Sequence, residues 1–227
     1  MKLIVTSDIH GHLPNISSCD LFIIGGDIFP KETDRDIEAQ ANWYHDVFAP
    51  WIDSLPCKYV VMTAGNHDYY LEKLYQEKHL NMLSSSKLKI LCNNMITLEG
   101  LRIYGTPNSL PLKKNFAFCQ DSAEIRETFG KIPSSLDILI AHAAPYDIGR
   151  LAGVEDGLDV GSPELSDVLK KRKIRFVFCG HIHNGNHKRV KWNGMTLYNV
   201  SRCNNLKEVS YPLLSLEIPF GRAVQPQ

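Results

Sequence analysis

The sequence predicts an α/β protein in which parallel strands alternate with helices and antiparallel hairpins extend the sheet. Short apolar runs rich in β-branched or aromatic residues recur along the chain, as expected for strands that are buried on both faces. A long amphipathic segment separates two of these runs, and two hairpin signals occur later. The five apolar runs are residues 3–5, 21–24, 59–62, 138–140 and 176–178.

A first helix is predicted between the second and third strands. Thr33 is its expected N-cap, because a threonine hydroxyl accepts a hydrogen bond from the free N–H groups of a first helical turn. From there apolar side chains recur at three- and four-residue steps as far as Leu55, which is typical of a helix packed on a sheet. Strand, helix and strand together form a β-α-β unit, the usual connection between parallel strands.

Further elements are predicted in the second half of the chain. Ser162 as N-cap and Pro163 in the first turn indicate a helix that leads into the fifth strand. The dipeptide Asn193-Gly194 is the strongest short signal for a hairpin turn. The two predicted hairpins span residues 96–104 and 190–198.

Length and composition are those of an ordinary globular protein. With 227 residues, of which 44% are hydrophobic and 22% charged, the chain can bury a sizeable core and resembles neither a fibre nor a disordered protein. The formal net charge is +0, so no strong overall field attracts nucleic acid or anionic lipid. We expect one domain over residues 1–227, with a loosely packed tail from about residue 219.

Cysteine usage and the first residues favour a cytoplasmic location. The 6 cysteines include no C-x-x-C pair and lack the density of a disulfide scaffold, so reduced thiols are expected. Met1 and Lys2 run directly into the first predicted strand and leave no room for an apolar signal peptide. No run approaches the roughly 18 apolar residues that a membrane helix needs, so no membrane partner is expected.

Each of the five predicted strands is followed immediately by residues that can bind metal ions. Because ligands bind beyond the carboxyl ends of the strands in parallel α/β sheets, these side chains are expected to meet on one rim. The residues are Asp8 and His10 after the first strand, Asp27 after the second, Asn66, His67 and Asp68 after the third, His142 after the fourth, and His181 and His183 after the fifth.

Each of these motifs alone has a simpler structural explanation. An aspartate such as Asp27 is more often a turn former than a ligand, and Asn66 is equally suited to a left-handed turn. Asp8 could cap a helix, and His181 and His183 could line the outer face of a strand. The structural explanation requires five coincidences in the same order, which favours a shared site.

Together and in this order, the motifs resemble the signature of the calcineurin-like metallophosphoesterases. The resemblance implies the metallo-dependent phosphatase fold, a four-layer α-β-β-α sandwich of two mixed sheets flanked by helices. It also implies hydrolysis of phosphate esters at a binuclear metal site. The matching segments are Asp8-x-His10, Gly26-Asp27, Gly65-Asn66-His67-Asp68, His142 and Gly180-His181-x-His183.

The resemblance also assigns two divalent or trivalent transition-metal ions to these residues. Mixed imidazole, carboxylate and amide ligation suits Mn, Fe, Zn, Co or Ni, and manganese is the expected ion. Phe29 and Pro30 occupy the positions near Asp27 where purple acid phosphatases carry a tyrosine ligand, so a ferric charge-transfer centre is not expected. The implied ligands are Asp8, His10 and His183 for the first ion, Asn66, His142 and His181 for the second, and Asp27 as the bridge between them.

Two such ions lower the pKa of a shared water, so that a metal-bound hydroxide is the expected nucleophile at phosphorus. His67 matches the family histidine that stabilises the transition state or protonates the leaving oxygen, and a purely supporting hydrogen bond is the alternative. Asp68 is expected to orient the His67 imidazole. Candidate substrate contacts are His12, Asn66, Tyr146 and Asn199.

A narrower resemblance favours a phosphodiesterase that acts on a small or nucleotide-like ester. Segments 104–107 and 198–201, among others, resemble a small branch that contains the vertebrate brain metallophosphodiesterases. Phosphomonoester hydrolysis is the near alternative. Cleavage of long nucleic acid is not favoured, although Lys188, Arg189 and Lys191 form a local basic patch. A binding scaffold that has lost hydrolysis is a further alternative, but no expected ligand is missing.

Overall fold

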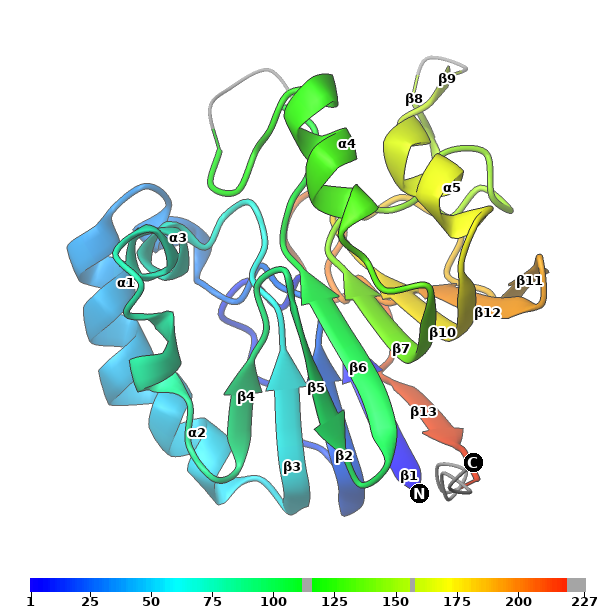
Figure 1. Ribbon diagram of the computed structural model, residues 1–227. Coiled ribbons are helices and arrows are strands. Elements are labelled where there is room, and N and C mark those ends of the chain that lie inside the picture. The colour runs from blue at the N-terminus through cyan, green and yellow to red at the C-terminus, as the bar shows by residue number, and fades with distance from the viewer. Residues whose placement is uncertain (112–115, 156–157, 220–227) are drawn as a thin grey trace.

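Two large sheets pack face to face, and each carries helices on its outer side (Figure 1). This arrangement is seen in a computed structural model, which describes residues 1–111, 116–155 and 158–219. The predicted four-layer α-β-β-α sandwich of two mixed sheets is therefore confirmed. The loosely packed tail that the sequence predicts lies outside the described residues from position 220 onward.

The first sheet contains the first three predicted strands and two strands that the sequence analysis missed. Its members are β1 (Lys2–Thr6), β2 (Cys19–Ile24), β3 (Cys57–Met62), β4 (Leu88–Ile90) and β13 (Leu214–Glu217). In the order β13-β1-β2-β3-β4, the last four strands are parallel and β13 pairs antiparallel with β1. The parallel strands therefore all end at the same edge of the sheet.

The second sheet contains the other two predicted strands and both predicted hairpins. Its members are β5 (Asn94–Leu98), β6 (Leu101–Thr106), β7 (Ser135–Ala141), β10 (Lys173–Cys179), β11 (Val190–Trp192) and β12 (Met195–Asn199). In the order β11-β12-β10-β7-β6-β5, the four central strands are parallel, and β5 and β11 are antiparallel edges. A small separate hairpin joins β8 (Val154–Glu155) to β9 (Leu158–Asp159).

The first predicted helix is divided into three parts and begins later than expected. The predicted stretch begins with a separate 3₁₀ turn, η1 (Lys31–Thr33). The helix that follows has three parts, which are α1 (Ile37–Trp43), the π-helical turn η2 (Tyr44–Phe48) and α2 (Ala49–Ser54). Thr33 is not the N-cap, because its hydroxyl donates to the carbonyl of Pro30 at 2.8 Å within the tight turn. Asp36 caps α1 instead, accepting a hydrogen bond from the backbone N–H of Ala39 at 3.0 Å.

Four further helical segments complete the outer layers. They are α3 (Tyr69–Gln76), the 3₁₀ turn η3 (Leu80–Leu83), α4 (Ser122–Gly130) and α5 (Pro163–Leu169). The predicted start of α5 is confirmed, because the Ser162 hydroxyl accepts a hydrogen bond from Leu165 N at 3.2 Å. Helix α4 is not among the predicted elements, although Asp121 and Glu124 form a capping box at its start.

Three apolar clusters fill the three interfaces between the four layers. Along β1, Leu3 and Val5 pack between the two sheets, whereas Ile4 packs toward the helices of the first layer. Because successive side chains of a strand point to opposite faces, a strand covered on both sides must be apolar at every position. This double burial explains why the central strands appear in the sequence as short continuous apolar runs.

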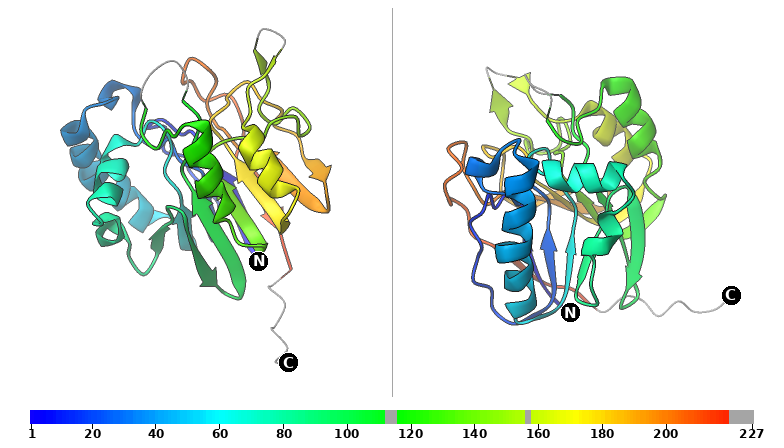
Figure 2. Two further views of the ribbon diagram at one scale, coloured as in Figure 1. Left: turned by 45° about the horizontal axis from the view of Figure 1, so that its top comes forward. Right: turned by 90° about the vertical axis from the view of Figure 1, so that its left-hand side faces the viewer.

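The helices divide between the outer faces according to chain half. Those between β2 and β4 cover the first sheet, while α4 and α5 cover the second, and the two groups lie on opposite sides in Figure 2. The N-terminal amine donates to the carbonyl of Ile218 at 2.8 Å, which places the start of the chain beside β13. Among the described residues, no helix is long and apolar enough to cross a membrane.

Candidate metal centre

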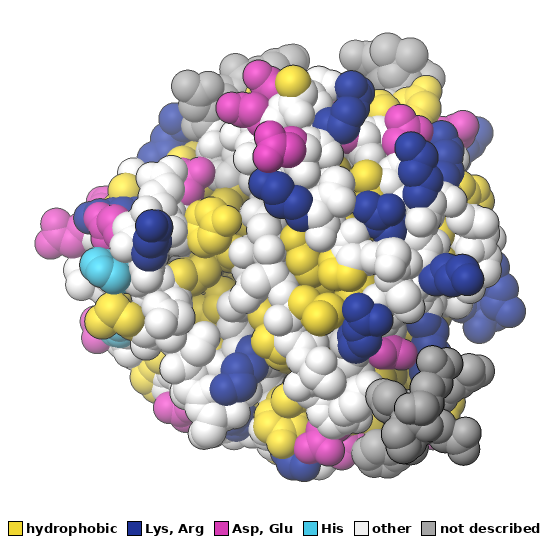
Figure 3. Space-filling view, in the orientation of Figure 1, with side chains coloured by type: hydrophobic (Ala, Val, Ile, Leu, Met, Phe, Trp, Pro, Cys, Tyr) yellow, Lys and Arg dark blue, Asp and Glu magenta, His cyan; other side chains and the backbone are white. Residues whose placement is uncertain are grey.

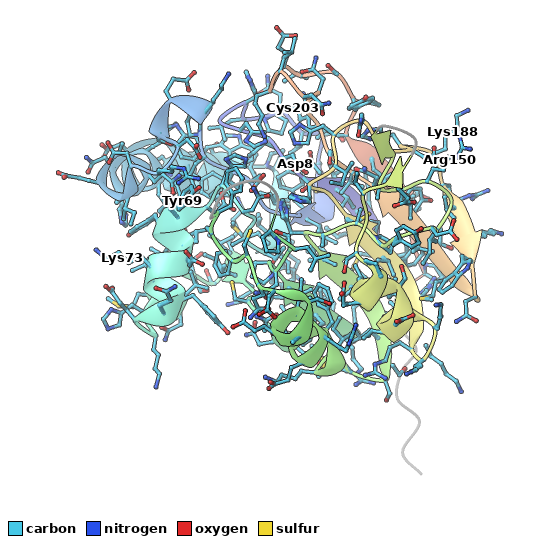
Figure 4. All side chains as sticks on the ribbon, turned by 90° about the horizontal axis from the view of Figure 1, so that it is seen from above. Asp8, Tyr69, Lys73, Arg150, Lys188 and Cys203 are labelled. Atoms are coloured by element: carbon cyan, nitrogen blue, oxygen red, sulfur yellow. The ribbon has the colours of Figure 1, made fainter. Side chains whose placement is uncertain are left out.

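The predicted ligands come from both sheets and meet at the rim beyond the carboxyl ends of the parallel strands. Figure 4 looks down on this rim, with Asp8 in the middle, Tyr69 on one side, and Arg150 and Lys188 on the other. Asp8 is fully buried, with 0% of its surface exposed, and the predicted ligands that follow it in the chain are buried or nearly so. Such a concentration of buried polar side chains needs a compensating partner.

The first cluster matches the ligand set implied for one ion. Ligand atoms of Asp8, His10 and His183 all lie within 4.8 Å of one another. His183 Nε2 is 3.2 Å from Asp8 Oδ1 and 3.5 Å from His10 Nε2. His10 Nε2 is also 3.8 Å from Asp27 Oδ2. One oxygen of the predicted bridge therefore faces this cluster.

The second cluster surrounds the side-chain oxygen of Asn66. His142 Nε2 lies 3.0 Å from Asn66 Oδ1, and His181 Nδ1 lies 2.6 Å from the same oxygen. The other carboxylate oxygen of Asp27, Oδ1, is 3.6 Å from His142 Nε2. Asp27 thus presents one oxygen to each cluster, which is the geometry that a bridging carboxylate requires.

The hydrogen bonds of two imidazoles test whether a cation fits these clusters. His142 Nδ1 donates to the carbonyl of Gly25 at 2.9 Å, and His183 Nδ1 donates to the carbonyl of Asn204 at 2.8 Å. When either ring is neutral, its remaining Nε2 is an acceptor, and it faces the side-chain oxygen of another ligand. Acceptors aimed at acceptors fit a positive ion between them, and the mixed nitrogen and oxygen donors suit a transition metal.

Unusual backbone conformations hold four of the predicted ligands. Asp8, His10, Asp27 and His181 have φ angles of 54°, 42°, 54° and 68°, in the left-handed region that residues other than glycine rarely adopt. Each such residue costs about 1 to 3 kcal/mol and persists only when its surroundings enforce it. Backbone hydrogen bonds of 2.9 Å from Asp8 N to Gly26 O and 3.0 Å from His10 N to Asp27 O do so here.

Two glycines allow the ligand loops to approach one another closely. A Cβ atom on Gly65 would collide with Asp27 Oδ1 and would lie 2.5 Å from His142 Cε1. A Cβ atom on Gly180 would collide with Asp8 Oδ2. Both glycines belong to the motifs on which the resemblance rests, and their missing side chains make room for the cluster.

Burial and neighbouring charges shift the pKa values of the predicted ligands in different directions. Burial lowers the pKa of His10 and of His181 to about 3, so both rings are neutral and able to bind metal near pH 7. Burial opposes the ionised form of Asp8, but the hydrogen bond and charge of His183 outweigh it and hold the pKa of Asp8 well below its usual range. The same pair raises the pKa of His183 despite its burial.

His67 lies beside the clusters, and Asp34 orients its ring. His67 Nδ1 is 2.9 Å from Asp34 Oδ1, while its backbone N–H donates to Asp27 Oδ1 at 2.8 Å. The His67 carbonyl accepts a hydrogen bond from Gln40 Nε2 at 2.9 Å, and Phe116 packs against the ring with centroids 5.0 Å apart. Asp34 and Gln40 are not predicted from the sequence, because both are far from the motif in the chain.

The predicted role of Asp68 is wrong. Its carboxylate accepts backbone hydrogen bonds from Asp27 at 2.9 Å, Ile28 at 2.9 Å and Gly65 at 2.7 Å, so it faces the backbone and not the His67 ring. Burial, followed by the charge of Asp27, raises the pKa of Asp68 well above its usual range. Asp68 therefore joins the loop after β2 to the loop after β3.

Two of the predicted substrate contacts, Asn199 and His12, form hydrogen bonds with backbone carbonyls of the protein itself. Asn199 is not available, because its Nδ2 donates to the carbonyls of Leu151 and Ile182 and its Oδ1 accepts from Ser201 N. His12 Nε2 donates to the carbonyl of Lys207 at 2.9 Å, which makes it a support for a nearby loop.

Three of the substrate contacts, His12, Tyr146 and Asn66, stay predictions. The Tyr146 side chain is 42% exposed, which leaves its ring accessible. Asn66 Oδ1 lies at the centre of the second ligand cluster, within 3.0 Å of two imidazoles. Ser201, beside the excluded Asn199, has a clearer role, because its hydroxyl donates to Asp8 Oδ2 at 2.9 Å and supports that ligand.

Comparison with known proteins matches the site to a family. Residues 1–185 match the family described as calcineurin-like phosphoesterase. The chain belongs to this family. It is 28% identical over 248 residues to human metallophosphoesterase domain-containing protein 1, a match that covers 97% of this chain and 72% of that protein.

Two more similarities extend this result without adding an activity. The chain is 29% identical over 201 residues to probable rhamnogalacturonate lyase C of Emericella nidulans, which is 84% of this chain but only 18% of that protein's length. The crystal structure of TT1561 from Thermus thermophilus superimposes with a TM-score of 0.60 at 14% identity, covering 94% of this chain and 93% of that one. At this identity the likeness concerns the fold alone.

Proposed function

We propose that this protein is a binuclear metal-dependent phosphodiesterase that acts on small or nucleotide-like esters. Membership of the calcineurin-like phosphoesterase family and the candidate metal-ligand clusters support a metal-dependent phosphoesterase. The observation that carries the binuclear centre is the position of Asp27, which presents one oxygen to each cluster. The preference for diesters rests on the narrower resemblance of the sequence. Manganese is the proposed ion, with Fe, Zn, Co or Ni as alternatives of similar ligand preference.

The residues divide into those that hold the ions and those that act on the ester. Two bound transition-metal ions would activate water for attack on phosphorus and neutralise the phosphoryl oxygens. Asp8, His10 and His183 would hold one ion, and Asn66, His142 and His181 the other, on either side of Asp27. His67 would donate a proton to the leaving oxygen through Nε2, because Asp34 accepts the hydrogen bond from Nδ1.

The surface supports a small ester as the substrate more than a long polyanion. On the face shown in Figure 3, which lies beside the rim and does not look into it, lysine and arginine side chains are scattered among other side chains. A protein that follows a nucleic acid backbone usually concentrates its cations in a continuous groove. The formal net charge of +0 agrees with this preference.

Hydrolysis of chromogenic esters tests the proposal directly. The manganese-loaded wild type should hydrolyse a chromogenic phosphodiester faster than the matching monoester, and Asp27→Ala should reduce the rate to background. Asp46→Ala is a suitable control, because Asp46 is exposed on η2 away from the rim and should leave the rate unchanged. Equal background rates for wild type and Asp27→Ala would favour the non-catalytic scaffold instead.

A substrate panel tests the proposed ester class. We expect nucleoside monophosphates to inhibit diester hydrolysis competitively and a single-stranded polynucleotide to be cleaved slowly. Faster cleavage of the polynucleotide than of any small diester would identify a nuclease. Faster hydrolysis of the monoester would identify the phosphomonoesterase alternative.

A further inference from the structure

A lysine reaches the first ligand cluster from a loop that the family motifs do not include. The Nζ of Lys207 lies 2.8 Å from His10 Nε2. Lys207 is part of the turn that follows β12. An isolated antiparallel β-bridge between the backbones of Cys203 and Val209 closes this turn. The Lys207 ammonium group therefore contacts a predicted metal ligand directly.

The turn that carries Lys207 is fastened to the site at several points. Asn204 Oδ1 accepts hydrogen bonds from Leu206 N at 2.9 Å and Glu208 N at 3.1 Å, which closes the turn around Lys207. The carbonyl of Asn204 accepts from His183 Nδ1 at 2.8 Å, so a predicted metal ligand holds the turn directly. The hydrogen bond from His12 Nε2 to the Lys207 carbonyl holds it from the other side.

The backbone of Lys207 also adopts a conformation that a lysine rarely adopts. Its φ angle is 65°, in the left-handed region where glycine or asparagine is preferred. Residues held in this way concentrate at binding sites, where the rest of the structure offsets the cost. The conformation directs a long cationic side chain from a fixed backbone position toward the rim.

A small pocket of about 110 Å³ lies between Lys207 and His67. Its remaining walls come from His10, Phe29, Pro30, Lys31 and Asp34. The Asp34 carboxylate is hydrogen-bonded to His67, so the two lysines are the cations that can attract an anion there. The pocket therefore joins the proposed proton donor, a metal ligand and a fixed ammonium group.

We propose that Lys207 is a substrate-binding residue whose ammonium group holds a phosphoryl oxygen of the ester. The inference rests on the proposed function and adds a specific residue to it. An ammonium group has three N–H donors. The contact with His10 Nε2 uses one of them while no ion is bound, and an ion on that nitrogen would release it. The other donors can bind oxygens of a phosphate that lies between the ligand clusters and His67. A charge-assisted hydrogen bond of this kind is among the strongest that proteins form.

Binding of inorganic phosphate tests the inference without relying on turnover. We would compare wild type, Lys207→Met, which keeps the length and loses the charge, and Lys207→Arg, which keeps the charge. Manganese content would be measured first, followed by calorimetric titration of the loaded proteins with inorganic phosphate. Lys207→Met should bind phosphate about tenfold more weakly or worse at unchanged metal content, and Lys207→Arg should restore part of the affinity.

Lys171→Met is the matched control, because Lys171 is an exposed lysine at the end of α5, at the opposite end of the second sheet from the rim. It should bind phosphate like the wild type. With a diester substrate, Lys207→Met should raise KM more than it lowers kcat. Mass spectrometry should also show that phosphate slows the reaction of Lys207 with an amine reagent.

The outcomes separate this inference from the proposed function. Unchanged phosphate affinity in Lys207→Met, while the wild type hydrolyses diesters, would overturn the role of Lys207 and leave the function intact. A changed manganese content with unchanged phosphate affinity would show that Lys207 serves only as a neighbour of His10, and would also overturn the inference. Weakened phosphate binding in a protein that hydrolyses no diester would support Lys207 and refute the phosphodiesterase.

Discussion

At the scale of single residues, the hydrogen bond between Asp34 and His67 determines which ring nitrogen is available for chemistry. Asp34 Oδ1 accepts from Nδ1 at 2.9 Å, so Nε2 is the nitrogen left to act on the substrate. The backbone N–H of His67 has a separate task, because it donates to Asp27 Oδ1. In the proposed mechanism, the side chain of His67 would serve catalysis, while its backbone positions a predicted ligand.

Replacing His67 by alanine should therefore separate catalysis from metal binding. His67→Ala removes the proposed proton donor but keeps the backbone hydrogen bond to Asp27. We expect an unchanged metal content and a loss in kcat of roughly a hundredfold or more, within the range of about 10² to 10⁴ for general acid catalysis. Loss of metal from this variant, measured by elemental analysis, would show that the ring is structural.

Asp34→Asn should have a smaller effect through the same ring. The amide can still accept the hydrogen bond from Nδ1, but it lacks the negative charge that favours this orientation and tautomer. We expect kcat to fall by about ten- to a hundredfold, the usual cost of removing a supporting partner. An unchanged kcat would exclude Asp34 from the mechanism, and the His67→Ala, Asp34→Asn double variant should be no slower than His67→Ala alone.

The sequence identified the residues of the motifs but not their partners. Asp68 was chosen to orient His67 because it is adjacent in sequence, yet neighbouring side chains often point in different directions. Asp34 was missed because its position depends on the 3₁₀ turn η1, which folds a distant segment over the third strand end. Asn199 is predicted only from the narrower resemblance, which does not reveal that backbone groups already occupy its side chain.

At the scale of elements, one buried carboxylate joins the two helices that cover the second sheet. Glu164, in the first turn of α5, accepts hydrogen bonds from Ser122 at 2.5 Å, on α4, and from Ser162 at 3.1 Å. Burial acts to raise the pKa of Glu164, but these hydrogen bonds outweigh it and the pKa lies below its ordinary value. The ionised form therefore stabilises the folded protein.

This lowered pKa predicts how stability depends on pH. The ionised Glu164 contributes fully above the unfolded-state pKa, and its contribution is lost as the pH falls through the lower pKa of the folded state. Glu164→Gln should therefore unfold more easily than wild type at pH 7, by about 1 to 3 kcal/mol. Denaturant titrations should show this difference shrinking as the pH falls below 4.5, the ordinary pKa. A constant difference at every pH would contradict the assignment.

Element boundaries were less predictable than element types. The central strands were recognisable because two covered faces require apolar residues throughout, and both hairpins had clear turn signals. The short edge strands β4 and β13 carry too few apolar residues to stand out, and β13 is half exposed along its length. The first helix kept its apolar spacing, but that spacing does not reveal the π-helical turn in its middle.

At the scale of the whole molecule, the ligand set bridges the two sheets. Asp8, Asp27 and Asn66 follow strands of the first sheet, whereas His142 and His183 follow strands of the second. Contacts between the sets, such as that from His183 to Asp8, cross the interface between the sheets. Ions bound here would therefore bind the folded protein in preference to the unfolded chain.

Metal removal should consequently lower the thermal stability of the whole protein. A ligand at a hundred times its Kd stabilises the folded state by about 2.7 kcal/mol, which corresponds to roughly 5 to 10 °C in Tm for a chain of this size. We expect chelation to lower the Tm of the wild type and added manganese to restore it. In calorimetric scans Asp27→Ala should respond to neither, and an equal response in that variant would place the stabilising ion elsewhere.

The connection between β4 and β5 divides the ligands by chain half. A cut there would leave Asp8, His10, Asp27 and Asn66 on one fragment and the three remaining histidines on the other, which also supplies β13 to the first fragment's sheet. Neither fragment alone would carry a complete set for either ion. Co-expressed fragments would have to reassemble before manganese could be retained, so the site could serve as a reporter of fragment complementation.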